Sequence, residues 1–212
     1  MSDAAEQQLA KAYHASTRET LVKTYDQWAD QYDADMQGIG YIHPAVMAGL
    51  VARCVLDAKA AILDAGVGTG TIGHLLHILG YSNLLGVDMS AGMLAKARAR
   101  GIFADLRQGV LGETLDFETA SMQAIVSSGT FTLGHAPASS FDELTRILQP
   151  GGHLIFTVGC VVWHEAGFAA KLAELVKAGV LSPIASTAPY YTMPLSKTEG
   201  NFQAQAHIYQ RT

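Results

Sequence analysis

The sequence predicts an α/β fold of the Rossmann-like, three-layer type, in which helices cover both faces of a mostly parallel, seven-stranded sheet. From about residue 58, short apolar runs alternate with helical segments, which is typical of a parallel sheet. A glycine-rich loop over 64–70 joins the first apolar run to the next helix. The chain before residue 58 reads as helices, and its last part as a helix and two strands. We therefore expect an N-terminal helical extension and a C-terminal antiparallel hairpin.

The first 57 residues predict three helices. The first covers 5–13, and the second runs from the capping segment 16–20 to about Met36. Gly38-Ile39-Gly40 ends the second helix, because glycine is unfavourable in a helix interior. The third opens at His43-Pro44, where proline near a helix start costs little.

The remaining elements follow from apolar runs and from helix start and stop signals. Strands are expected at 61–63, 83–87, 102–107, 122–127 and 153–158, with helices at 71–79, 91–100 and 138–148 between them. A helix at 163–178 and hairpin strands at 185–191 and 204–209 complete the chain. The 212 residues fit one domain, comprising a helical lid (1–57), a ligand-binding core (58–159) and a C-terminal helix and hairpin (160–212).

Composition narrows the class of protein. The formal net charge is −5, which argues against a nucleic-acid partner held by a basic face and leaves small molecules and proteins open as substrates. An oligomer is possible. No apolar run approaches the ~20 residues of a membrane span, and the polar N-terminus lacks a signal-peptide core. Cys54 and Cys160 stand alone, so neither a metal site nor a disulfide scaffold is expected. These features predict a cytoplasmic protein.

The glycine loop reads Asp64-Ala65-Gly66-Val67-Gly68-Thr69-Gly70. Glycines let the backbone approach a ligand closely, and a helix start behind them offers unpaired N–H groups. Thr71 stands where a pyrophosphate-binding loop prefers a third glycine. Asp64 would repel a pyrophosphate, whereas it suits a cationic amine such as that of an amino acid. The alternative is a tight turn that binds nothing.

Asp88 closes the second predicted strand, and an acid there accepts hydrogen bonds from ribose hydroxyls. It also precedes a helix start, where the helix dipole favours an acid without any ligand. Together, Asp64 and Asp88 match an adenosyl amino acid better than a dinucleotide.

With these motifs, the chain resembles class I S-adenosylmethionine-dependent methyltransferases of the small-molecule type, in particular the methyltransferase-like 27 and ubiquinone-biosynthesis-type groups. The resemblance extends over about 25–158 and rests on the segments 25–33, 62–70, 86–94, 124–129 and 148–158. Its most specific part is the combination of the glycine loop, Asp88 and Leu148-Gln149-Pro150-Gly151-Gly152. The resemblance implies S-adenosylmethionine as the cofactor and S-adenosylhomocysteine as the product.

The resemblance also implies roles for individual residues. Asp64, Gly66, Gly68, Thr69 and Gly70 would hold the methionine part of the cofactor, Asp88 the ribose and Met89 the adenine. Ser127, Ser128 and Gly129 would lie near the sulfonium, and Tyr25 and Trp28 would cover the cofactor from the N-terminal helices.

The chain departs from the family pattern after the third strand. The family commonly has an acid there that accepts from the adenine amino group, whereas this chain has Val110. Adenine recognition would then fall to backbone groups of Gly109, Val110 and Leu111, or to Asp105 or Glu113 if the register differs.

Three residues are catalytic candidates on the substrate side: His135, Tyr41 and His43. His135 follows the fourth strand at the ligand edge, where it could accept a proton from an oxygen or nitrogen nucleophile. Methyl transfer from a sulfonium needs alignment more than a catalytic motif, because the cofactor carries its own leaving group. Two rival hypotheses remain: a nicotinamide-dependent oxidoreductase, and a module that binds the cofactor without turnover.

Overall fold

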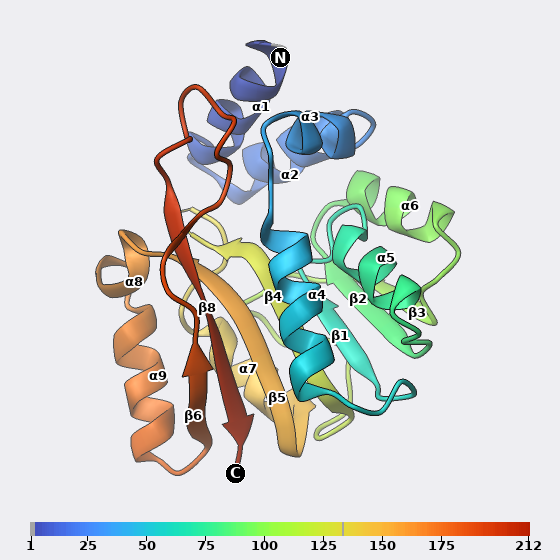
Figure 1. The fold of residues 1–212 in the computed structure, drawn as a ribbon, viewed down its shortest axis with the longest axis vertical. Helices are drawn as coiled ribbons and strands as arrows, with labels where there is room; N and C mark the ends of the chain where they lie inside the picture. Colours follow the sequence, from blue (N-terminus) through green and yellow to red (C-terminus); the bar gives the residue numbers. More distant parts are fainter. Residues whose placement is uncertain (1–2, 133) are drawn as a thin grey trace.

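The computed structural model describes residues 3–132 and 134–212, and one eight-stranded sheet forms its centre (Figure 1). The strands are β1 (Ile62–Ala65), β2 (Leu84–Asp88), β3 (Asp105–Gln108), β4 (Met122–Phe131), β5 (Leu148–Gly159), β6 (Leu181–Ser186), β7 (Tyr190–Tyr191) and β8 (Gln203–Arg211). Their order is β3-β2-β1-β4-β5-β8-β6, and β7 pairs with β8. Strands β1 to β5 pair parallel with one another, whereas β8 pairs antiparallel with β5, β6 and β7. The predicted α/β class with a mostly parallel sheet is confirmed.

Helices cover both faces of this sheet. They are α4 (His43–Cys54), α5 (Thr71–Ile78), α6 (Ala91–Ala99), α7 (Ser140–Ile147), α8 (Val162–Glu165) and α9 (Phe168–Lys177). Side chains of α4 and α5, such as Met47 and Leu76, bury one sheet face, which includes Ala124. Side chains of α7 and α9, such as Phe141 and Phe168, bury the other. The sheet therefore reads as continuous apolar runs, because both of its faces are buried.

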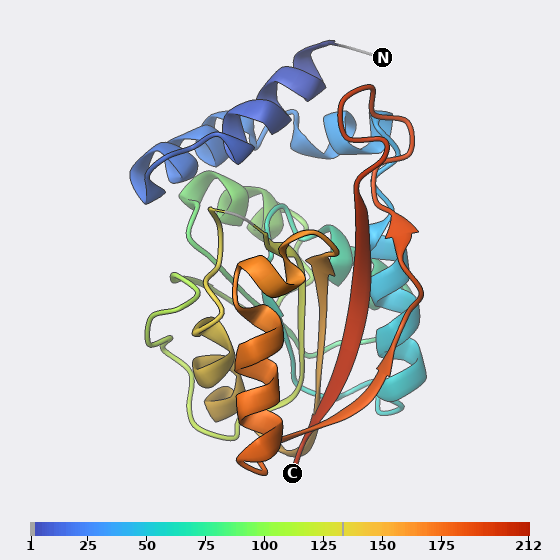
Figure 2. The ribbon, with the colours of Figure 1, turned by 90° about the vertical axis from the view of Figure 1, so that its left-hand side faces the viewer.

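Three N-terminal helices, α1 (Asp3–Tyr13), α2 (Arg18–Trp28) and α3 (Tyr32–Gly38), lie across the carboxyl ends of the parallel strands (Figures 1 and 2). Thr17 caps α2, and its hydroxyl accepts a hydrogen bond from the Thr20 amide, as the capping segment predicted. Open α/β sheets bind ligands at this edge. We call α1, α2 and α3 the lid.

Two predicted helices are each broken into two. The helix expected from about Thr17 to Met36 breaks between α2 and α3, and Trp28 Nε1 donates to Asp35 across the break at 2.7 Å. The helix expected at 163–178 divides into α8 and α9 at Gly167, whose φ of 79° ends one helix and starts the next. In both places tertiary contacts or a left-handed residue override helical periodicity.

The C-terminal strands differ from the prediction in number and bounds. The strand expected at 185–191 is replaced by β6, which starts at Leu181, and by the two-residue β7. Pro183 is accommodated because β6 lies at the sheet edge and its register with β8 shifts beside this residue. Strand β8 pairs with β5, β6 and β7, so the sheet has eight strands and not seven. No helix formed by the described residues is long and apolar enough to cross a membrane.

Candidate functional site

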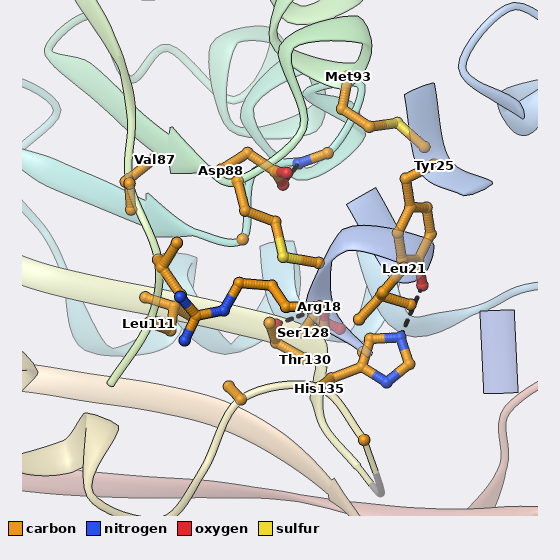
Figure 3. Close-up of a pocket in the computed structure, with 18 of the residues that line it drawn as sticks. Arg18, Leu21, Tyr25, Val87, Asp88, Met93, Leu111, Ser128, Thr130 and His135 are labelled. Carbon is orange, nitrogen blue, oxygen red and sulfur yellow. Dashed lines mark hydrogen bonds between the residues drawn. The ribbon is translucent and has the colours of Figure 1, made fainter. Parts of the chain in front are cut away.

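A cavity of about 180 Å³ lies between the lid and the carboxyl ends of the parallel strands (Figure 3). We call it the first cavity. Twelve of the predicted site residues line it: Tyr25, Tyr41, Gly66, Gly68, Asp88, Met89, Gly109, Val110, Leu111, Ser128, Gly129 and His135. These residues come from six separate stretches of the sequence (25, 41, 66–68, 88–89, 109–111 and 128–135), which the parallel strands and the lid bring to one place.

The glycine loop forms one wall of the first cavity. The Gly66 and Val67 amides donate to the Val87 carbonyl at 2.8 and 3.0 Å, which fixes the loop to β2. Gly68 lines the cavity with a φ of 53°, and a Cβ there would meet no atom within 4 Å. The loop therefore presents bare backbone to the cavity, as binding of a ligand at close range requires.

Asp88 stands at the end of β2 with its carboxylate oriented by the loops around it. Its Oδ2 accepts from the Gly68 amide at 2.8 Å, and its Oδ1 accepts from the Ser90 amide at 2.9 Å. Burial raises the pKa of Asp88, and the amides of Ser90 and Gly68 act against that rise by stabilising the carboxylate. Each oxygen keeps lone pairs with which it can accept further hydrogen bonds from a ligand.

Asp64 lies on β1 behind the cavity wall and is 2% exposed. Both of its carboxylate oxygens are buried without a hydrogen-bond partner among the described residues. Burial, together with the charge of Asp88, raises the pKa of Asp64 to about 8. A buried carboxyl group without a partner is costly, and a nearby cation would relieve that cost.

Thr69, Gly70 and Ser127, which were also predicted as site residues, lie outside the lining of the first cavity and support the segments that form its walls. Thr69 donates its hydroxyl to Asp33, and Gly70 caps α5 at a φ of 83°. Ser127 is fully buried and donates to the Ala65 carbonyl at 2.7 Å, which links β4 to β1. We infer that these residues hold the glycine loop and the end of β4 in shape.

Asp33 fastens the lid to the glycine loop. Its carboxylate accepts from the hydroxyl of Thr69 and pairs with the guanidinium of Arg100. Arg100 also donates from Nε to the Thr69 carbonyl at 2.6 Å. One acid on α3 thus joins α3, the glycine loop and the end of α6.

Asp26 makes a second fastening from α2. Its Oδ1 accepts from the Ser90 hydroxyl at 2.6 Å and from the Gly92 amide at 2.8 Å. Ser90 is the predicted cap of α6, and its Oγ accepts from the Met93 amide at 3.1 Å. The lid therefore rests on the helix start next to Asp88.

Tyr25 and His135 meet at one side of the first cavity (Figure 3). The Tyr25 hydroxyl and His135 Nε2 share a hydrogen bond of 2.9 Å. Burial raises the pKa of Tyr25 far above its usual value, so this phenol keeps its proton. The pair can hold a proton at a defined place beside a ligand.

A second cavity, of about 40 Å³, adjoins the first and shares Tyr25, Tyr32, Tyr41 and Gly129 with it. Trp28 and His43, two predicted site residues, line only the second cavity. Trp28 stacks on Tyr25 with ring centroids 6.2 Å apart. His43 Nδ1 and the Tyr190 hydroxyl are hydrogen-bonded at 2.8 Å, and burial lowers the pKa of His43 to about 3.

Several residues of the first cavity escaped the reasoning from sequence: Arg18, Leu21, Tyr32, Val87, Met93, Gly134, Ala136 and Pro137. Arg18 had the features of a helix-start residue, and Tyr32 those of an aromatic core stripe. Neither spacing nor composition tells that α2 and α3 turn these side chains toward the sheet edge.

Glu113 and Asp105, the two acids named above as alternatives for adenine recognition, each form an ion pair. Glu113 pairs with Arg18 at 2.6 Å, and Asp105 pairs with Arg107 at 2.7 Å.

The site chemistry fits S-adenosylmethionine. Asp88 can accept from ribose hydroxyls, and the unpartnered carboxyl of Asp64 lies near the loop that would hold a cationic amino acid group. The bare backbone at Gly68 leaves room for close approach. Val110 lines the first cavity in place of the family's adenine-binding acid, beside Gly109 and Leu111.

Comparisons with known proteins agree with this fit. A family model described as a methyltransferase domain matches residues 63–156. Human methyltransferase-like protein 27 is 31% identical over 166 residues, which cover 74% of this chain and 66% of that protein. A malonyl-[acyl-carrier protein] O-methyltransferase from Marinomonas sp. (strain MWYL1) is 30% identical over 149 residues, 67% of this chain and 52% of that protein. The chain therefore spans less than two thirds of the length of these relatives.

A solved structure shows the same fold. It is geranyl diphosphate C-methyltransferase from Streptomyces coelicolor A3(2), in complex with Mg²⁺, geranyl diphosphate and S-adenosyl-L-homocysteine. It superimposes with a TM-score of 0.61 at 16% identity, covering 95% of this chain and 87% of that one. The comparisons give no support to the oxidoreductase hypothesis. The sequence motifs, the fold and these relatives together place the chain in the family of class I S-adenosylmethionine-dependent methyltransferases.

Proposed function

We propose that this chain binds S-adenosylmethionine in the first cavity and transfers its methyl group to a small-molecule acceptor. The single observation that carries the proposal is the wall formed by Asp88 and the bare backbone of Gly68, joined by a hydrogen bond of 2.8 Å. This wall pairs a hydrogen-bond acceptor with room for close approach, as an adenosyl amino acid requires.

Within this proposal, each group of the wall has a part. Asp88 binds the ribose, Met89 and the backbone of Gly109, Val110 and Leu111 contact the adenine, and the glycine loop holds the amino acid end. Ser128 and Gly129 stand beside Tyr41, whose hydroxyl lies 2.5 Å from where a Cβ on Gly129 would be. A side chain at 129 would therefore displace Tyr41 from the cavity.

When bound, S-adenosylmethionine would supply a methyl group attached to a positively charged sulfur. The lone pair of the acceptor would form a bond to the methyl carbon while the bond from that carbon to sulfur breaks, which leaves S-adenosylhomocysteine. The chain's residues align the acceptor and exclude water. His135, oriented by Tyr25, accepts the acceptor's proton if that atom carries one, and later releases it to solvent. Tyr41 contacts the acceptor at the boundary of the two cavities, and the uncharged His43 lies deeper.

A thermal-shift titration tests the cofactor assignment. S-adenosylhomocysteine at about a hundred times its Kd should stabilise the protein by about 2.7 kcal/mol, whereas NAD should not raise the melting temperature. Asp88→Ala should abolish the shift, and Asp105→Ala, which removes an acid at the start of the neighbouring strand β3, outside the cavity wall, should preserve it. Stabilisation by NAD alone would contradict the assignment.

Turnover is tested separately, by release of S-adenosylhomocysteine during incubation with S-adenosylmethionine and a broad panel of small acceptors. We expect at least one acceptor to be methylated, with its mass raised by one methyl group. Cofactor binding without methylation across the panel would instead favour a binding module.

A further inference from the structure

The second cavity lies where an acceptor must approach. It is bounded above by α1, α2 and α3 and below by β4 and β5. Tyr25, Tyr41 and Gly129 belong to the walls of both cavities, so a molecule in the second cavity contacts the boundary with the first. The two cavities therefore adjoin and share part of their walls.

The two cavities differ in charge. The wall of the first includes the ionisable side chains of Arg18 and Asp88. Among the described residues, the wall of the second includes no aspartate, glutamate, lysine or arginine. It consists mainly of rings and apolar side chains, among them Tyr13, Phe131 and Phe202.

The pKa shifts of two groups in the second cavity also indicate that this cavity disfavours charge. Burial lowers the pKa of His43 to about 3, which opposes a positive charge. Burial also raises the pKa of Tyr13 to about 12, which opposes a negative charge. Surroundings that disfavour both ions also disfavour an ionic ligand.

We propose that the second cavity is the acceptor chamber, and that the part of the acceptor entering it is uncharged and apolar, because the described residues of its wall supply rings and no ionic side chain. This inference rests on the proposed methyl transfer, since it assigns the acceptor of that same site. The acceptor bears a neutral nucleophile, such as a hydroxyl or a thiol, at the end that faces Tyr25 and Tyr41. The remainder of the molecule packs between the lid and the sheet.

An anionic acceptor lacks a partner here. Arg18, a cation in the wall of the first cavity, already pairs with Glu113 at 2.6 Å. A carboxylate in the second cavity would therefore be buried without a counter-charge. An ammonium group could face the aromatic rings, but its protonated nitrogen has no lone pair with which to attack a methyl group.

The chamber must adapt to its occupant. A volume of about 40 Å³ holds a few water molecules, and a ring needs more room. Met36 and Met193 line it, and methionine side chains change shape at low cost. Glu6 on α1 holds the loop after β7 by accepting from the Ser196 hydroxyl at 2.9 Å and from the Thr198 hydroxyl at 2.6 Å. We expect acceptor entry to move this side of the lid.

Calorimetric titration of the full chain, saturated with S-adenosylhomocysteine, tests the inference. Two matched sets of ligands serve as probes: 4-methylphenol, 4-methylbenzoate and 4-methylbenzylammonium, and hexanol, hexanoate and hexylammonium. At neutral pH, the neutral member of at least one set should bind at least about tenfold more tightly than both ions, a difference of ~1.4 kcal/mol. Equal affinities, tighter binding of an ion, or no binding by any probe would each overturn the proposal.

Two variants locate the binding. Met36→Phe fills the second cavity and should weaken the neutral probe about tenfold, with little effect on S-adenosylhomocysteine. Met93→Phe narrows the first cavity and should weaken S-adenosylhomocysteine instead. Probe binding unchanged in Met36→Phe would place the probe elsewhere and contradict the proposal.

Fluorescence gives a second, local measurement. The chain has two tryptophans, and Trp28 lines the second cavity whereas Trp163 stacks on His207 with ring centroids 4.4 Å apart. In a Trp163→Phe background, hexanol should change the emission of Trp28.

The two proposals fail in different ways. Failure of S-adenosylhomocysteine to bind would contradict the proposed function, whereas its binding without the expected probe selectivity contradicts the acceptor inference alone.

Discussion

At the scale of single residues, Asp64 is a position where stability of the protein and binding of the cofactor should respond to substitution in opposite directions. Its side chain is buried, and neither carboxylate oxygen has a hydrogen-bond partner among the described residues. The sequence already indicated this residue as the partner of a cationic amine. The structure adds that the carboxyl group is buried outside the lining of the first cavity, and that burial raises its pKa to about 8, so that a cation bound nearby would favour its ionised form.

Asp64→Asn should therefore raise the stability of the ligand-free protein near neutral pH and weaken cofactor binding. The folded-state pKa of about 8 lies above the ordinary 3.8, so the folded form binds the proton more tightly than the unfolded form. Between these values, ionisation of the unfolded chain lowers wild-type stability as pH rises. The advantage of the variant should thus grow from about pH 4 to pH 8 and vanish in acid, as measured by urea unfolding. A pH-independent difference would contradict this account.

Tyr25 offers a second test at this scale. Tyr25→Phe keeps the ring that lines both cavities but removes the hydrogen bond to His135. We expect kcat for an acceptor that loses a proton to fall about tenfold or more, while the Kd of S-adenosylhomocysteine stays within about twofold. Tyr209→Phe, which removes a tyrosine hydroxyl outside the walls of both cavities, serves as the matched control. An equal loss of kcat in both variants would indicate altered packing in place of proton handling.

At the scale of elements, the lid depends on a few polar side chains that reach down from α2 and α3. Asp33 accepts from Thr69 and pairs with Arg100, whereas Asp30 forms a single pair with Lys96 at 2.5 Å. The Asp30 side chain is 80% exposed, so its pair with Lys96 contributes little. Asp33 joins three elements and should matter more.

Asp33→Asn should weaken the attachment of α3 to the glycine loop and speed dissociation of S-adenosylhomocysteine by about threefold to tenfold, measured by stopped-flow competition. Asp30→Asn is the control, and its dissociation rate should match the wild type. Equal effects of the two substitutions would contradict the fastening role of Asp33. A structured α1–α4 region in both variants, seen by circular dichroism, would exclude simple unfolding of the lid.

At the scale of the whole molecule, the first cavity lies at one edge of the sheet. The first cavity touches the lid, the glycine loop and the ends of β2, β3 and β4, whereas β6 and α9 lie away from its walls. The molecule therefore combines a packed support with a separate helical cover over the cavity, an arrangement that can exclude water from a site.

Hydrogen exchange should show this division. Saturation with S-adenosylhomocysteine should slow amide exchange in α2, α3 and residues 66–70, and leave β6 and α9 unchanged. Mass spectrometry of peptides with and without ligand measures this directly. Uniform protection of all peptides would indicate global stabilisation and no separate lid, and protection absent from α2 would remove α2 from the binding site.

The sequence by itself determined the local chemistry of this protein. Glycines, caps and acidic residues specify the loop at 64–70, the cap at Ser90 and the acid at Asp88, because these depend on backbone conformation and hydrogen bonds a few residues away. The apolar periodicity likewise predicted the parallel sheet. Those properties can be read from the chain because they need no distant partner.

Tertiary structure alone decided how the lid meets the sheet. The hydrogen bond of Tyr25 with His135 joins positions 110 residues apart, and the second cavity exists only where α1, α3 and β5 converge. The break between α2 and α3 and the division of the C-terminal strands also follow from long-range packing. Helical spacing alone makes Tyr32 look like a core residue, and only packing brings it to the wall of the first cavity.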